Sequence, residues 1–227
     1  MRYVISDIHG EYDLLLRLLE KIRFSDTDTL YVLGDMIDKG ECSVGVLHTL
    51  LPMKNAKIIL GNHEKAFLDY YRSLLNSGME PAKLLSELRS YFPKDGGLLT
   101  FEDMDSLEEL PLYIDGPDFI GVHAGVPLVG NGKIPPLHTV NPAVLLHDRR
   151  FKEPKVLPEN ERCVFFGHTT TESALGMQGI AVYRRIGTRG DRIEDYIKIH
   201  LDTGAFHSGT LGLFCIDTCY AHYVNKR

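Results

Sequence analysis

The chain has 227 residues, 44% of them hydrophobic, so it can bury a sizeable core in one α/β domain or at most two. Its net charge of −6 leaves no basic excess, which excludes a broad nucleic-acid or anionic-membrane footprint. The N-terminal apolar run is too short for a secretory signal and no stretch approaches a membrane span, so we expect a cytoplasmic protein. The cysteines form no CxxC pair and are expected to be free thiols: Cys42, Cys163, Cys215 and Cys219.

Short apolar runs that are rich in β-forming residues and bounded by glycine predict buried strands. In chain order these runs are residues 2–5, 29–33, 57–60, 119–122, 163–166, 180–183, 196–202 and 210–217. Helices are predicted between the early strands, at residues 11–23, 64–75 and 81–91. Residues 131–142 read as a surface loop. The pattern predicts an α/β sandwich of mixed β-sheets flanked by helices, in a single domain of residues 1–227.

Each of the first five strands is followed at once by side chains that can bind a metal. In chain order they are Asp7 and His9, then Asp35, Asn62, His123 and His168. Taken singly, Asp7 or Asn62 could cap a helix, and His123 could be a core histidine. Caps do not favour histidine, however, and ligands of α/β folds gather at the carboxyl ends of strands. The set therefore predicts a metal site.

These side chains offer carboxylate, imidazole and amide groups and no thiolate. That mixture suits Mn²⁺, Fe or Zn²⁺ better than a structural zinc site built from cysteines. Six ligands are too many for one catalytic ion with an open position, and they fit two ions that share a carboxylate. We therefore expect two divalent metal ions, Mn²⁺ first and Fe or Zn²⁺ as alternatives, in a site that binds phosphate and activates water.

Five motifs occur in a fixed order along the chain. They are DIHG (residues 7–10), GDMIDKG (34–40), GNHE (61–64), HAG (123–125) and GHT (167–169). With them the sequence resembles the metallophosphoesterase superfamily, in particular its phosphoprotein-phosphatase branch of phage and bacterial Ser/Thr phosphatases. Residues 202–217 resemble the closing strands of that family. The resemblance implies a metallophosphoesterase-type sandwich and a hydrolase that cleaves phosphomonoesters by attack of a hydroxide bridging two metals.

The resemblance also implies roles for individual residues. His63 would be the general acid that protonates the leaving oxygen, and Asp38 would orient it and favour its charged form. Glu64 would be structural. The implied metal ligands are Asp7 and His9 for the first ion, Asp35 as the bridge, and Asn62, His123 and His168 for the second ion.

The sequence departs from the family pattern where the substrate phosphate should bind. Position 39 holds lysine instead of the usual arginine, so Lys39 keeps the charge and loses the bidentate fork. We expect it to contact phosphate; a solvated lysine is the alternative. A second arginine is expected after the HAG motif, where Arg149 fits best by spacing and Arg150 is the alternative. His200 is the alternate metal ligand should His168 fail.

The leading functional interpretation is a Ser/Thr phosphoprotein phosphatase acting on phosphorylated protein or peptide. GNHE, rather than a GNHD-type signature, favours that branch. A symmetrical dinucleoside tetraphosphate hydrolase acting on nucleotide phosphates and a small-molecule phosphatase are the alternatives. A non-catalytic metal-binding scaffold is a remote one, because all the implied ligands and the acid are present. Loops such as residues 72–95 and 131–142 would decide among substrates. The sequence leaves the oligomeric state open.

Overall fold

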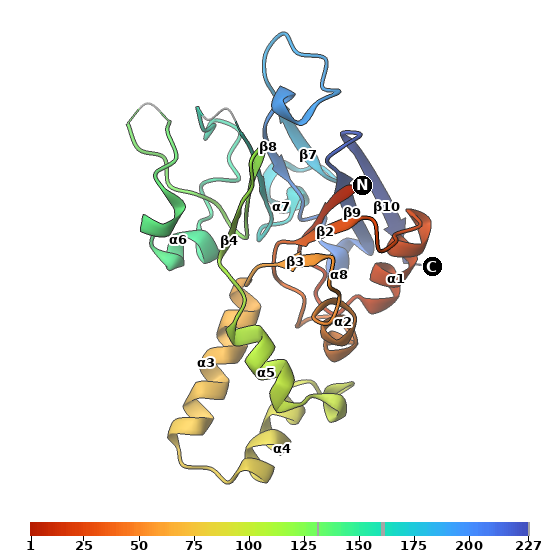
Figure 1. Ribbon diagram of the computed structural model, residues 1–227, viewed down its shortest axis with the longest axis vertical. Coiled ribbons are helices and arrows are strands. Elements are labelled where there is room, and N and C mark those ends of the chain that lie inside the picture. The colour runs from red at the N-terminus through yellow and green to blue at the C-terminus, as the bar shows by residue number, and fades with distance from the viewer. Residues whose placement is uncertain (131, 160–161, 227) are drawn as a thin grey trace.

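The computed structural model describes residues 1–130, 132–159 and 162–226 and contains two mixed β-sheets (Figure 1). The first comprises β1 (Arg2–Ile5), β2 (Thr29–Val32), β3 (Ala56–Ile58), β9 (Thr210–Cys215) and β10 (Tyr220–Asn225). The second comprises β4 (Tyr113–Asp115), β5 (Phe119–Val122), β6 (Cys163–Phe166), β7 (Ala181–Arg184) and β8 (Tyr196–His200). Their strand orders are β10-β9-β1-β2-β3 and β4-β5-β6-β8-β7. The predicted fold class is confirmed.

Each sheet combines three parallel strands with two antiparallel ones, which lie together at one edge of the first sheet and at opposite edges of the second. In the first sheet β1, β2 and β3 run parallel, and in the second β5, β6 and β8 do. Strands β9, β10, β4 and β7 pair antiparallel. Because parallel strands end at the same edge, each sheet collects three strand-end loops at one side.

The strands alternate their side chains between two hydrophobic layers, as the pleat requires. On β1, Val4 packs with Phe165 and Ile199 of the second sheet, between the sheets. Its neighbour Ile5 faces the opposite way, toward the helices that cover the first sheet. On the far face of the second sheet, Phe166 packs under the loops and the helix that follow β5. The result is a helix–sheet–sheet–helix arrangement.

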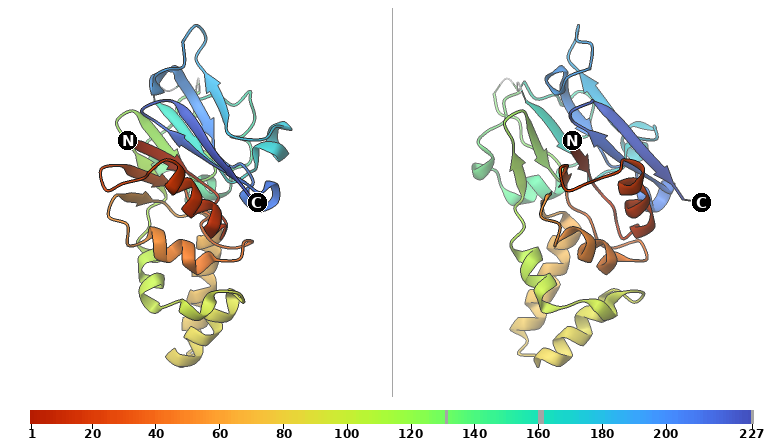
Figure 2. Two further views of the ribbon diagram at one scale, coloured as in Figure 1. Left: turned by 90° about the vertical axis from the view of Figure 1, so that its right-hand side faces the viewer. Right: turned by 45° about the vertical axis from the view of Figure 1, so that its right-hand side comes forward.

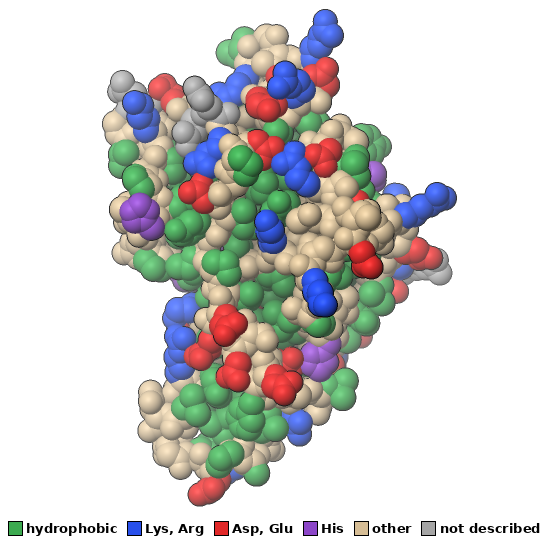
Figure 3. Space-filling model, viewed as in Figure 1, with side chains coloured by type: hydrophobic (Ala, Val, Ile, Leu, Met, Phe, Trp, Pro, Cys, Tyr) green, Lys and Arg blue, Asp and Glu red, His purple; other side chains and the backbone are tan. Residues whose placement is uncertain are grey.

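The helices cover the sheets and form one projection. They are α1 (Tyr12–Lys21), α2 (Ser43–Leu50), α3 (Asn62–Asn76), α4 (Pro81–Tyr91), α5 (Phe101–Glu108), α6 (Pro142–His147), α7 (Thr171–Leu175) and α8 (Ala205–Ser208). Short 3₁₀ turns lie at η1 (Gly96–Leu98), η2 (Leu137–Thr139) and η3 (Ile193–Asp195). Residues 62–108, which contain α3, α4 and α5, extend away from the sheets as a helical arm (Figures 1 and 2). Hydrophobic side chains are prominent on one face of this arm (Figure 3).

The structure differs from the prediction mostly at element boundaries. Helix α3 begins at Asn62 and not at residue 64, because Gly61 is its extended N-cap residue. The strands predicted over residues 196–202 and 210–217 end earlier, at His200 and Cys215. Strands β4 and β10 and the short helices α5, α6, α7 and α8 were not predicted. A capping box in which Thr100 and Asp103 bond to each other's backbone N–H marks the start of α5 and was a readable signal.

Three smaller expectations can be compared with the structure. All four cysteines are free. The predicted loop at residues 131–142 contains η2, and its residue 131 lies outside the described residues. Across the residues that the structure describes, none of the helices has both the length and the apolar character needed to cross a membrane.

Candidate metal centre

The loops after six parallel strands, three from each sheet, carry the six predicted ligands and one further carboxylate, that of Asp202. The residues that follow β1, β2, β3, β5, β6 and β8 are, in order, Asp7 with His9, Asp35, Asn62, His123, His168 and Asp202. The backbone N–H of His168 donates to both carboxylate oxygens of Asp7 at 3.1 Å, which joins the loops of the two sheets across 161 residues of sequence. The structure thus brings all six predicted ligands together.

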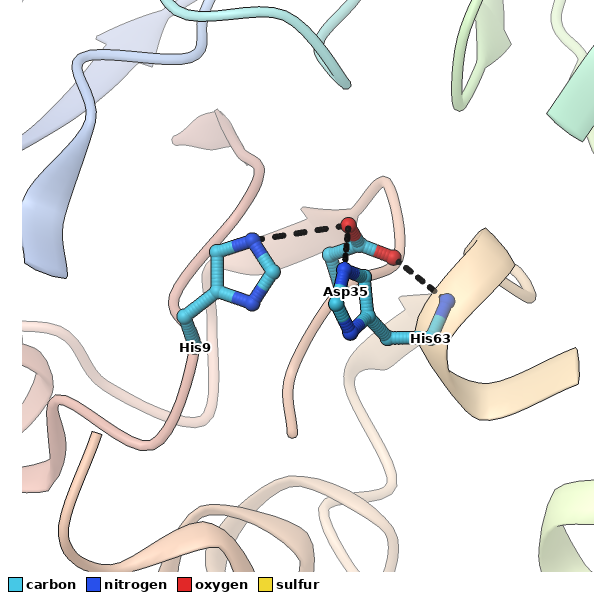
Figure 4. Close-up of side chains that lie close together, drawn as sticks. All are labelled: His9, Asp35 and His63. Atoms are coloured by element: carbon cyan, nitrogen blue, oxygen red, sulfur yellow. Dashed lines mark hydrogen bonds and ion pairs between the residues drawn. The ribbon is translucent and has the colours of Figure 1, made fainter. Parts of the chain in front are cut away.

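Asp35 lies at the centre of the cluster, and its two carboxylate oxygens face different histidines. Its Oδ2 is 3.5 Å from His9 Nε2, and its Oδ1 is 3.4 Å from His123 Nε2. Asp7 Oδ1 lies 3.9 Å from His9 Nε2. Figure 4 shows the rings of His9 and His63 directed at the same carboxylate oxygen of Asp35, Oδ2. Atoms that each bind one ion at about 2.0–2.2 Å lie roughly 3–4 Å from one another, so these spacings suit metal ligands.

Asn62 occupies the other side of the cluster, where its Oδ1 lies 2.8 Å from both His123 Nε2 and His168 Nδ1. His123 Nδ1 donates to the Leu33 carbonyl at 2.8 Å, so Nε2 of the neutral ring carries a lone pair. Two acceptors, His123 Nε2 and Asn62 Oδ1, therefore face each other, and Asp35 Oδ1 adds a third. A cation among these atoms would satisfy all three.

Backbone carbonyls orient the rings of the histidines. His9 Nδ1 donates to the Ile37 carbonyl at 2.9 Å, which turns Nε2 toward Asp35. The Leu33 carbonyl does the same for His123. Such bonds are the usual way in which a protein fixes the tautomer of a metal-binding histidine.

The electrostatics of the cluster also fit divalent cations. Burial raises the pKa of both Asp7 and Asp35 to about 6. Burial lowers the pKa of His9 to about 2 and that of His168 to about 3, and it lowers the pKa of His123 as well. Buried carboxylates beside uncharged imidazoles leave negative charge without compensation, which is costly in a protein interior. Divalent ions would supply the missing positive charge, so the residues present fit the two metals that the sequence predicts.

His63 stands at the edge of the cluster and differs from the other histidines. Its Nδ1 donates to Asp38 Oδ2 at 2.6 Å, and this bond raises the pKa of His63. Its Nε2 lies 3.9 Å from Asp35 Oδ2, so distance alone would also admit it as a ligand beside His9. A ring whose pKa is raised, however, is better suited to donate a proton than to offer a lone pair to a cation.

Glu64 ties two of the strand-end loops together. It is fully buried, and its Oε2 accepts from the backbone N–H of Asp35 at 2.8 Å and of Gly61 at 2.9 Å. Its Oε1 accepts from Met36 N at 2.7 Å and Ile37 N at 3.1 Å. These contacts agree with the structural role predicted for Glu64, and they fix the loop that presents Asp35.

The backbone is strained where the predicted site residues lie. Eight non-glycine residues among those described have positive φ, and six of them are predicted site residues: Asp7, His9, Asp35, Asp38, Lys39 and His168. A left-handed conformation costs about 1–3 kcal/mol for such residues and concentrates at functional sites. Lys39 has this left-handed backbone, and its side chain points toward the cluster, where Nζ donates to His9 Nε2 at 2.7 Å.

The two arginines after the HAG motif have different surroundings. Arg150 is exposed, lies 3.7 Å from Asp148 and lines a pocket with Val126 and Phe151. Arg149 is also exposed, but it lies near enough to His168 for its positive charge to lower the pKa of that histidine. Only burial and His123 lower this pKa more. The surroundings therefore favour Arg149 over Arg150 as the arginine near the metal ligands.

The sequence interpretation missed Asp202 as a site residue. Asp202 is buried, and its Oδ1 accepts from Gly204 N at 2.9 Å. Burial first, and then the charges of Asp7 and Asp35, raise its pKa well above the usual value. The signal was present, because Asp202 follows a parallel strand as the predicted ligands do. The predicted strand ran through residue 202 and hid it.

The structure does not place His200 in the cluster. Its Nε2 donates to the Thr169 carbonyl, and its ring stacks on Phe166 with 4.4 Å between the ring centroids. His168, the preferred residue, is the one that contacts Asn62. His200 is therefore not needed as the alternate ligand; it supports the loop that carries His168.

The family model of calcineurin-like phosphoesterases matches residues 2–191, a range that contains all six predicted ligands and His63. The chain belongs to the calcineurin-like phosphoesterase family. This membership confirms the metallophosphoesterase resemblance.

Several curated proteins similar to this calcineurin-like phosphoesterase are named symmetrical bis(5'-nucleosyl)-tetraphosphatases. The one from Vibrio vulnificus is 31% identical over 126 residues, which cover 55% of this chain and 44% of that protein. The one from Salmonella paratyphi C is 38% identical over 128 residues, which cover 55% of this chain and 43% of that protein. The chain thus aligns with less than half the length of these relatives.

Solved structures share the fold at lower sequence identity. A candidate diadenosine tetraphosphatase aligns with a TM-score of 0.72 at 20% identity, covering 99% of this chain and 92% of its own. A protein serine/threonine phosphatase from Saccharomyces cerevisiae aligns with a TM-score of 0.55 at 15% identity, covering 100% of this chain and 80% of its own. At such identities the likeness shows the calcineurin-like fold alone.

Proposed function

We propose that this phosphoesterase hydrolyses dinucleoside tetraphosphates symmetrically, adding one water to release two nucleoside diphosphates. The observation that carries the proposal is the name shared by the curated relatives, symmetrical bis(5'-nucleosyl)-tetraphosphatase. It favours the alternative that the sequence left open over the Ser/Thr phosphatase that the sequence placed first. Both reactions break a P–O bond at a phosphoryl group, so the same ligand cluster serves either one.

Two divalent metal ions, Mn²⁺ first among the candidates, are assigned to the cluster. Asp7 and His9 would hold one ion, and Asn62, His123 and His168 the other. Asp35 would be shared by the two ions, since one of its oxygens faces His9 and the other faces His123. When bound, such ions polarise the phosphoryl oxygens and lower the pKa of a bound water.

His63 is assigned as the general acid, with Asp38 as its positioning partner. The bond from His63 Nδ1 to Asp38 fixes the ring and leaves Nε2 directed toward Asp35 and the reacting phosphate. From there Nε2 can give its proton to the oxygen of the departing diphosphate as the P–O bond breaks. Lys39 and Arg149 are assigned to the substrate phosphates. Lys39 contacts His9, and the charge of Arg149 lowers the pKa of His168, so both lie near the cluster, whereas Arg150 lines another pocket.

The test is turnover of the full chain loaded with Mn²⁺, with diadenosine tetraphosphate and a phosphoserine peptide as parallel substrates. The proposal expects diadenosine tetraphosphate to be preferred in kcat/KM and ADP to be the sole nucleotide product. AMP with ATP would contradict symmetrical cleavage. Preference for the peptide would return the function to a Ser/Thr phosphatase with the same site residues.

His63→Asn separates the acid from the ligands. The variant should lose turnover and keep its metal content, measured by plasma emission spectrometry. The loss should be larger for the phosphoserine peptide than for the tetraphosphate, because an alkoxide needs protonation more than a diphosphate does. Loss of metal in this variant would make His63 a ligand instead.

A further inference from the structure

A pocket next to Asp38 and Lys39 is lined on its other side by residues that have no part in the chemistry assigned above. It lies between the helical arm and the connection from β2 to α2, and its volume is about 190 Å³. Asp38 and Lys39 line one wall, and Tyr91, Phe92, Pro93 and Lys94 line the other. We propose that this pocket binds the nucleoside of the departing nucleotide, with its base against the ring of Tyr91. The inference rests on the proposed function and names the part of the substrate that the helical arm recognises.

The position of the acid decides which part of the substrate reaches this pocket. A general acid must contact the leaving oxygen, so the departing group lies on the side of His63. Asp38 both accepts from His63 Nδ1 at 2.6 Å and lines the pocket. Lys39 also lines the pocket, and its Nζ contacts His9 Nε2 at 2.7 Å, so the pocket borders the cluster next to the acid, where the departing group would leave.

Tyr91 is built as a stacking surface. Its ring lies against Phe67, Tyr70 and Phe92, with centroid distances of 4.8, 5.6 and 5.1 Å, which hold it in place. The residue nevertheless keeps 37% of its surface exposed. Burial raises the pKa of Tyr91, and the nearby carboxylate of Asp38 adds to the rise. A ring already fixed by its neighbours loses little conformational entropy when a base stacks on it.

The wall that carries Tyr91 is anchored to the body of the protein. Asp95 Oδ2 accepts from Val44 N at 2.6 Å and Gly45 N at 3.3 Å, at the start of α2. Lys94 pairs with Glu41 across the pocket rim. These contacts tie the end of the helical arm to the β2–α2 connection, so the two walls keep a fixed separation.

Size and charge favour an uncharged ring over a phosphate in this pocket. Sites for whole drug-sized ligands occupy about 300–1,000 Å³, so about 190 Å³ suits one ring system and not a whole dinucleotide. On the wall formed by the helical arm the charges are already matched, because Lys94 pairs with Glu41 and Asp95 accepts from two amides; Lys39, assigned to the substrate phosphates, lies on the opposite wall. A phosphate would find no unmatched positive charge along the aromatic wall, whereas a base would find the ring.

The test compares Tyr91→Leu with Tyr91→Phe, which keeps the ring, in the Mn²⁺-loaded full chain. One readout is KM for diadenosine tetraphosphate. The other is inhibition of glycerol 2-phosphate hydrolysis by ADP and by inorganic pyrophosphate, which share a diphosphate and differ in the nucleoside. Stacking of a base on an aromatic ring gives an expected rise of roughly 5- to 100-fold in KM and in the ADP inhibition constant for Tyr91→Leu. In Tyr91→Phe, KM and the ADP inhibition constant should stay as in the unmodified protein. The pyrophosphate inhibition constant should stay the same in both variants.

An unchanged ADP constant in Tyr91→Leu would overturn the proposal, as would an equal rise for ADP and pyrophosphate. ADP that inhibits the unmodified protein no better than pyrophosphate would overturn it too. The proposed function fails separately, if glycerol 2-phosphate is hydrolysed and diadenosine tetraphosphate is not. In that case the two inhibition constants still decide whether the pocket binds a nucleoside.

Discussion

Glu64→Gln should destabilise the protein strongly although it changes one atom. Each carboxylate oxygen of Glu64 accepts from two backbone N–H groups: Asp35 and Gly61 on one, Met36 and Ile37 on the other. An amide can present only one oxygen, so its NH₂ group must face two N–H donors in a fully buried place. At about 1–3 kcal/mol for each of the two unsatisfied buried groups, the expected loss is about 2–6 kcal/mol of unfolding free energy.

Urea denaturation of the metal-free protein measures this loss. The unfolding free energy falls by about 2–3 kcal/mol per molar urea, so the urea concentration at the unfolding midpoint should drop by roughly 1–3 M. Glu109→Gln is the matched control, because Glu109 is exposed and its change should stay within about 0.5 kcal/mol. A loss below about 1 kcal/mol for Glu64→Gln would refute the reasoning, since it would mean that a neutral side chain satisfies the same four amides.

Three further predictions concern the ligands, the phosphate contacts and a buried lysine. Asp35→Asn should lower metal occupancy and turnover together, because both oxygens of Asp35 face histidines; normal occupancy by plasma emission spectrometry would exclude the bridge. Arg149→Ala should raise KM for the phosphate substrate roughly tenfold, as expected for a lost charge-assisted bond, while Arg150→Ala leaves it unchanged; equal effects would contradict the assignment. Lys198 is fully buried and donates to three backbone carbonyls in residues 151–156, and burial lowers its pKa to about 7. At a pH between the folded and the unfolded pKa of Lys198, the unfolded chain binds more protons than the folded one. From about pH 7 to pH 9 the unfolding free energy should therefore rise by roughly 1 kcal/mol per pH unit, compared with that of Lys198→Met. A flat difference would show that the carbonyls keep the ammonium charged.

The sequence by itself determined the strands at the centre of the sheets and the ligands that follow them. Strands β1, β5 and β6 have the predicted bounds, because their apolar runs are short, buried and bounded by polar or glycine residues. The ligands could be read because each lies within a few residues of a strand end, so their signal is local. Edge elements carry a weaker signal: β4 has three residues, and β10 is half exposed, so neither needs a continuous apolar run.

Only the tertiary structure decided how these residues act on one another. Three sets of contacts join segments that are distant in sequence. The Asp35 oxygens face His9 and His123, Glu64 accepts from the amides of residues 35–37, and Tyr91 lines a pocket with Asp38. Such contacts depend on the packing of the sheets and on the docking of the helical arm. Local propensity and periodicity report on neighbours along the chain, and they carry no record of which loops the packed layers bring together.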